Sequence, residues 1–131
     1  MTRTMTRRML GAGLLISLGL YSTGCSAIAE LGPMADAGQA FMKSMKDADH
    51  EASFRMLAKA LQEKIGGQEG WDAFCEPRVP TEWSFSNRNI ENSQGHLSGS
   101  VKMANGQSLN VELTLVKEDN LWKLTGVRFA S

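Results

Sequence analysis

The sequence predicts a single α+β domain in which three N-terminal helices pack on a curved four-stranded antiparallel sheet. Three observations support this fold class. Apolar residues recur at helical spacing up to about residue 75, they alternate with polar residues from Thr81 onward, and an Asn-Gly pair at 105–106 indicates a tight hairpin. Each expected strand has one apolar face, so the helices are expected to cover one side of the sheet.

The three expected helices precede residue 76. The first runs from about Pro33 or Ala37 to Asp47, and the third covers about residues 68–75. The second covers residues 50–66 behind an Asp49 cap, and the Gly-Gly pair at 66–67 ends it. The apolar faces expected to reach the core are Phe41, Met42, Met45 and Ala48 in the first helix, Phe54, Leu57, Leu61 and Ile65 in the second, and Trp71 and Phe74 in the third.

The four expected strands follow Pro80. In the last one, Val127 and Phe129 are out of phase with Trp122 and Leu124, which predicts a β-bulge at Gly126. Trp83 and Trp122 are expected to be buried against the second helix. The full set of positions expected to face the helices is Trp83, Phe85, Leu97, Val101, Met103, Leu109, Val111, Leu113, Leu115, Trp122 and Leu124.

A family resemblance appears at this point. The expected helices come first and are followed by a Trp-x-Phe strand (Trp83, Phe85), the Asn-Gly hairpin and a closing Trp-Lys-Leu-x-Gly-x-x-Phe strand (residues 122–129). This arrangement resembles the nuclear-transport-factor-2-like, or cystatin-like, fold. More narrowly, they are similar to uncharacterised bacterial lipoproteins of that fold. The resemblance covers about residues 35 to 130 and implies a cone-like domain. Some members are enzymes and many are binding or accessory domains, so the fold alone does not choose a function.

The first 24 residues have the order of a secretory signal peptide. Three arginines lie in the first eight residues, and an uncharged stretch with four glycines follows to Gly24. A permanent membrane span is disfavoured because it needs about 20 strongly apolar residues. We therefore expect a signal peptide over 1–24, a tether over 25–36 and one domain over 37–131.

Cys25 resembles the acylated cysteine of bacterial lipoproteins. Thr23 and Gly24 match the small residues of the lipobox, whereas Ser22 stands where an aliphatic residue is usual. The resemblance implies palmitate-type acylation of Cys25 and a membrane anchor in the cell envelope, with Ser26 implying the outer membrane if the host has one. The alternatives are ordinary cleavage with a free Cys25, and export by a twin-arginine signal around Arg7-Arg8.

Cys75 has two expected states. If Cys25 is acylated, Cys75 is the only other cysteine and has no internal disulfide partner; if it is not, the two could pair in an oxidising compartment. As a nucleophile it is disfavoured, because no basic residue adjoins it in the sequence to lower its pKa. The expected role of Cys75 is that of a small buried hydrophobe.

Charge and motifs exclude several function classes. The chain has 14 Lys+Arg and 14 Asp+Glu. Three of the basic residues are the N-terminal arginines, so 11 basic and 14 acidic residues remain after residue 24. This balance disfavours nucleic acid as a partner. We find no phosphate loop, metal-ligand spacing or nucleophile elbow, so no cofactor, metal or catalytic residue is expected. The expected function is a non-catalytic envelope module for a small apolar ligand or a partner protein. The alternative is a small-molecule enzyme of the same fold, such as an isomerase or hydrolase.

A ligand pocket is predicted between the helices and the sheet. A bulged, curved sheet covered by short helices can leave space where the helices diverge. The alternative is that the same side chains fill this space and the domain is a solid wedge. The residues expected to line the pocket are Phe54, Leu57, Trp71, Phe74 and Trp83.

Overall fold

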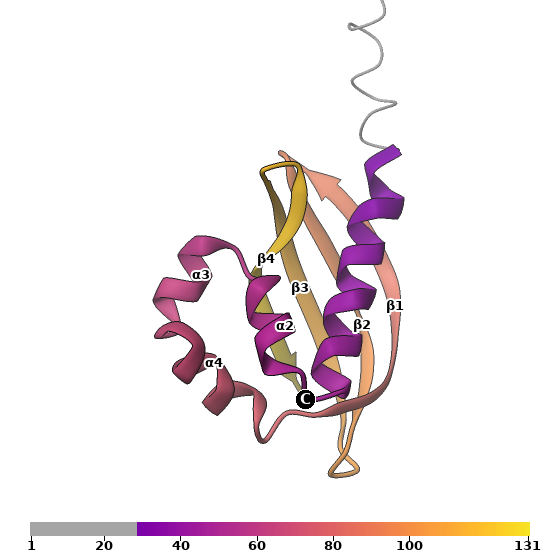
Figure 1. Cartoon of the computed structure of the whole chain (residues 1–131). Helices are drawn as coiled ribbons and strands as arrows, with labels where there is room; N and C mark the ends of the chain where they lie inside the picture. The colour runs from indigo at the N-terminus through magenta and orange to yellow at the C-terminus, as the bar shows by residue number, and fades with distance from the viewer. Residues whose placement is uncertain (1–28) are drawn as a thin grey trace, which may run out of the picture. The chain divides into compact units, whose positions relative to one another are not determined.

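The computed structural model describes residues 29–131, and its compact unit runs from Leu31 to Ser131. Helices come first and an open, curved sheet follows, which confirms the α+β class (Figure 1). The strands are antiparallel and lie in chain order, so the sheet is a simple meander. They are β1 (Pro80–Glu91), β2 (Gln94–Met103), β3 (Ser108–Glu118) and β4 (Leu121–Ala130).

The first helix covers residues 29–46 and lies along the face of the sheet (Figure 1). Its buried side includes Met34, Phe41, Met42 and Met45. Gly38 lets the helix approach the sheet closely, because a Cβ there would overlap the Leu97 side chain. Residues 29–36, expected to belong to the tether, are therefore helical: packing of this stripe overrides the helix-breaking tendency of Gly32-Pro33.

Ala48 lies outside the core because the first helix ends before it. The backbone turns left-handed at Ala48 (φ 57°), and Asp49 N donates to Ser44 O at 2.9 Å. This is the hydrogen-bond pattern of a Schellman C-cap, which stops the helix before residue 48. Ala48 is exposed, so its predicted place on the buried face is wrong.

The predicted second helix is two helices in the structure, α2 (His50–Arg55) and α3 (Lys59–Lys64). The chain between them pairs with the sheet edge: Leu124 N donates to Met56 O at 2.9 Å, and Ala58 N donates to Leu124 O at 2.7 Å. Leu57, at the centre of this bridge, is 1% exposed. These bonds to β4 replace two helical ones, which is why an uninterrupted amphipathic pattern does not give one helix.

The helix α4 (Gly67–Cys75) agrees with its predicted position. It follows α3 through left-handed Gly66 (φ 91°) and Gly67 (φ 72°). Gly70 makes this junction tight, because a Cβ there would overlap the carbonyl oxygen of Ile65. The two helices therefore form a compact corner beside α2 (Figure 1).

The sheet confirms most of the predicted strand phase. The bulge predicted at Gly126 is present, because Thr114 pairs with Gly126 and Leu115 pairs with Leu124. Trp83 and Trp122, however, are only half-buried, so their expected burial against the second helix is wrong. The predicted inward positions that are buried are Phe85, Leu97, Val101, Met103, Val111, Leu113, Leu115 and Leu124.

Candidate functional site

The five residues predicted to line a pocket are divided between two places. Trp71 is 1% exposed and lies between Phe41 (ring centroids 5.9 Å apart) and Phe74 (5.2 Å, stacked). Leu57 is held against β4, and Phe54 is half-buried against the same core. Leu57 and Trp71 thus belong to the packed core, and Phe54 and Phe74 lie against it.

Trp83 lies on β1 against the first helix instead. Its indole Nε1 donates to Gln39 Oε1 at 2.7 Å. A surface hollow of about 340 Å³ is lined by Trp83 together with Gln39, Lys43 and Lys46. The structure thus brings Trp71 and Phe74 together and gives Trp83 different partners. Cys25, the predicted acylation site, lies outside the described residues.

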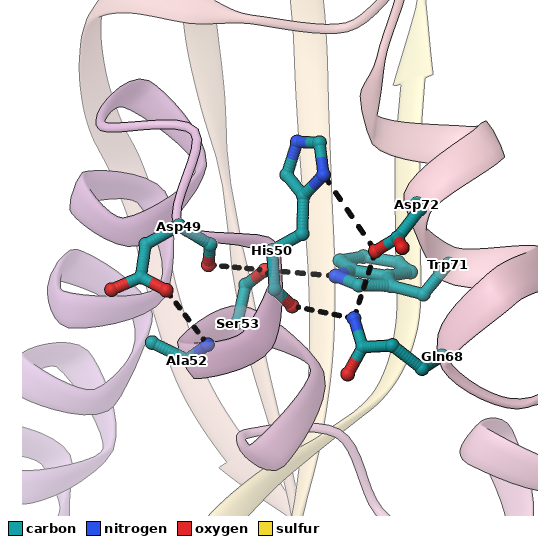
Figure 2. A network of polar contacts seen from close by, with 7 residues as sticks. All are labelled: Asp49, His50, Ala52, Ser53, Gln68, Trp71 and Asp72. Carbon is teal, nitrogen blue, oxygen red and sulfur yellow. Dashed lines mark hydrogen bonds and ion pairs between the residues drawn. The ribbon is translucent and has the colours of Figure 1, made fainter.

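A polar network joins α2 to α4, and its side chains face one another in Figure 2. Gln68 Nε2 donates to His50 O at 3.1 Å and to Asp72 Oδ1 at 2.8 Å. His50 Nδ1 lies 3.6 Å from the same Asp72 oxygen. The sequence does not predict this network, because the network joins α2 to α4 across a break in the single helix expected over residues 50–66.

Ser53 is the buried centre of the network. It is 0% exposed, and its hydroxyl accepts a hydrogen bond from Trp71 Nε1 at 2.8 Å. The hydroxyl in turn lies 3.2 Å from the carbonyl oxygens of Asp49 and His50, to either of which it can donate. A hydroxyl with these partners satisfies the indole N–H inside the core. The arrangement positions Trp71 and ties the two helices together.

Cys75 ends α4 beside this network as a free thiol that is 1% exposed. Burial, and then the charge of Asp72, raise the pKa of Cys75 to about 12. The hydrogen bond to Ser53 and the charge of Arg78 lower that pKa by less. The thiol therefore stays protonated at neutral pH, and a thiol in that state is a poor nucleophile and a poor metal ligand.

A hollow of about 610 Å³ lies at one end of the domain, and we call it the hairpin hollow. Its lining comes from the α4–β1 link, the turn between β2 and β3, and the last residues of β4, which lie at the same end in Figure 1. Apolar and polar groups are both present. The lining residues are Pro77, Arg78, Met103, Asn105, Gln107, Leu109, Phe129, Ala130 and Ser131.

Arg78 is held in place at the wall of the hairpin hollow. Its Nη1 donates to Phe74 O at 2.8 Å, and its guanidinium carbon lies 4.3 Å from the centre of the Phe74 ring. The ring face favours the cation, and the planar guanidinium is pre-organised by the stacking. Across the hollow, Asn105 Oδ1 accepts from Gln107 N at 2.9 Å, which fixes the turn.

Sequence analysis did not identify the hairpin hollow. Its lining residues come from three short segments that only the meander topology brings together. The one local signal is that Arg78 lies in the short link between Pro77 and Pro80, where the prolines restrict the backbone.

The outer face of the sheet is polar and only shallowly hollowed. Three hollows of about 220, 340 and 360 Å³ follow β1, β2 and β3. Most of the side chains there are short and uncharged, and His96 is half-buried beside Glu112 and Asn89. Each of these hollows exposes less apolar surface than the hairpin hollow, whose lining includes Met103, Leu109 and Phe129.

Metal-binding groups and membrane-spanning helices were both looked for in the part of the chain that the structure describes, and neither is present there. Over residues 29–131, no group of three or more His, Cys, Asp or Glu side chains could hold a metal ion. Within the same range, no helix is both long and apolar enough to span a bilayer.

Neither the protein-family models nor the curated proteins that we compared with this chain give a match.

Proposed function

We propose that the protein is a non-catalytic binding module of the cell envelope, anchored through acyl chains on Cys25, that takes a small apolar ligand in the hairpin hollow. The observation that carries the proposal is the hollow itself. It measures about 610 Å³, within the range of small-molecule sites, and its lining combines apolar side chains such as Met103, Leu109 and Phe129 with polar ones.

The absence of catalysis is part of this proposal, and the lining of the hollow supports it. No Asp, Glu, His or Cys is among the described residues that line it. Three groups of a kind used in acid–base or nucleophilic chemistry, His50, Ser53 and Asp72, belong to the α2–α4 network instead, and His96 lies on the outer face of the sheet. A cavity enzyme would need such groups beside its substrate.

We also propose that the domain has the nuclear-transport-factor-2-like fold of bacterial lipoproteins. Helices that precede a curved antiparallel meander support this assignment.

Acylation is tested first. In cells given labelled palmitate, the protein is expected to become labelled, and Cys25→Ser is expected to abolish the label because the thiol is the acyl acceptor. Cys75→Ser is the matched control, since it removes the only other cysteine and should leave the label unchanged. A Cys25→Ser protein that still incorporates palmitate would contradict the anchor.

Ligand binding is tested in the full-length chain in lipid nanodiscs, with methionine methyl groups labelled for NMR. Octanamide, an uncharged amphiphile, is expected to shift the Met103 methyl signal and to leave that of Met42, in the first helix, unchanged. Leu109→Asn is expected to weaken binding about tenfold, because it puts a polar group in the floor of the hollow.

Leu121→Asn is the matched control for that experiment. Leu121 is 59% exposed at the turn between β3 and β4, outside the hollow, so its substitution should leave the affinity unchanged. If octanamide does not shift the Met103 signal, or if both substitutions weaken binding equally, a surface that binds a partner protein becomes the better account.

A further inference from the structure

Arg78 is a cation with an unused hydrogen-bonding capacity in the wall of the hairpin hollow. A guanidinium carries five N–H donors, and the described residues accept only the Nη1 bond to Phe74 O. No acidic side chain in residues 29–131 forms an ion pair with Arg78. Its guanidinium is therefore not engaged in a direct ion pair with a side-chain carboxylate of these residues.

Two other basic side chains near the ends of elements are engaged differently. Lys43 pairs with Asp47 at 2.9 Å, and Arg128 pairs with Glu112 at 3.4 Å. Both pairs lie on exposed surface, where such interactions contribute little. Arg78 is half-buried, is stacked on Phe74 and lines a hollow whose floor is apolar. A charge in that setting is screened less by solvent than an exposed one.

We propose that the hairpin hollow selects an amphipathic anion, with Arg78 binding a carboxylate or phosphate group and the apolar floor holding the rest of the molecule. The proposal rests on the function proposed above and adds the class of ligand. A guanidinium presents paired N–H groups that match two oxygens of a carboxylate or phosphate. Met103, Leu109 and Phe129 supply the apolar contact surface.

The surroundings favour an anion over a cation. Every lining side chain other than Arg78 is uncharged. Asn105 and Gln107 are bonded to each other, so the amides at the turn are already partnered. Arg78 thus supplies the one charged side chain of the lining, and an anionic head group that its guanidinium reaches gains more than a neutral one of the same shape.

The test compares three probes with one eight-carbon chain: octanoate, octyl phosphate and octanamide. Binding is followed by the Met103 methyl signal of the full-length chain in nanodiscs of uncharged lipid. We expect the wild-type protein to bind at least one of the two anions about tenfold or more tightly than the amide. The difference between octanoate and octyl phosphate then distinguishes a carboxylate ligand from a phosphate ligand.

Arg78→Gln is expected to remove the preference, so that all three probes bind with the affinity of octanamide. Arg78→Lys retains the charge and should keep part of the preference. Arg55→Gln is the matched control: Arg55 lies on α2, is exposed and pairs with Glu51 at 3.8 Å, so the preference should not change. Because Arg78 also contacts Phe74, an unshifted Met42 signal is used to confirm that each variant is folded.

The outcomes separate this inference from the function on which it rests. Equal binding of the amide and both anions to the wild-type protein overturns the anion preference and leaves an apolar site standing. A preference that survives Arg78→Gln overturns the role of Arg78. Failure of all three probes to shift Met103 overturns both the ligand class and the binding function.

Discussion

Replacing Trp71 by Ala is expected to lower the free energy of unfolding by about 3–5 kcal/mol. Trp71 is 1% exposed, is stacked against Phe74 and contacts Phe41 of the first helix, so its removal opens a cavity where three helices meet. Domains of this size have only about 5–15 kcal/mol of stability. Urea denaturation followed by circular dichroism measures the change.

Two further variants keep this prediction informative if Trp71→Ala does not fold. Trp71→Phe retains an aromatic ring but loses the hydrogen bond to Ser53, which should cost about 1–2 kcal/mol. Trp83→Ala removes a half-buried indole whose partner is an exposed Gln39, and its cost should be about half that of Trp71→Ala. A Trp71→Ala protein more stable than Trp83→Ala would show that Trp71 is not at the centre of the core.

The strands could be predicted from the sequence because they depend on local patterns. Period-2 alternation identifies the buried face, Asn105-Gly106 identifies the hairpin, and the phase change around Gly126 identifies the bulge. Each of these signals lies within about ten residues. The antiparallel meander then follows, because short turns join neighbouring strands.

The helical half was less predictable because long-range contacts determine it. The helix expected over residues 50–66 is interrupted at Leu57, where the backbone pairs with Leu124 of the distant β4. Helical periodicity continues across this point, so no local signal indicates the break. The first helix likewise begins before Pro33 because Met34 and Ala35 are buried in the core.

The candidate site shows the same limit more strongly. The predicted pocket used four aromatic residues and Leu57, of which Trp71 and Leu57 are each 1% exposed in the core. The hairpin hollow depends on Arg78, Met103 and Phe129, which lie on three separated segments. The topology of the sheet brings these residues together, so no pattern of residues within one segment predicts the hollow.

The prediction that tests the sheet geometry most directly is Gly99→Ala. Gly99 lies on β2 opposite Phe85, next to a bulge at which Ser86 is the extra residue of β1. A Cβ at this position would overlap the carbonyl oxygen of Ser84 and lie 2.9 Å from the Phe85 Cα atom. Both obstacles are backbone atoms, which cannot move aside as a side chain can. Overpacking of this kind costs about 1–3 kcal/mol or more, and urea denaturation should show a loss in that range.

Gly126→Ala is the matched control for Gly99→Ala, since Gly126 also lies at a bulge of the same sheet. A Cβ there would be 3.5 Å from the Thr114 side chain, an ordinary van der Waals contact, and its φ is not positive. We therefore expect Gly126→Ala to change the stability by less than about 0.5 kcal/mol. Ala adds the same methyl group at both positions. Comparing the two stability losses therefore distinguishes an effect of the close approach of β1 and β2 from a general requirement for glycine at a bulge. Equal losses in the two variants would mean that β1 does not cross Gly99 as closely as the structure has it, and the curvature of β1 would then need another origin.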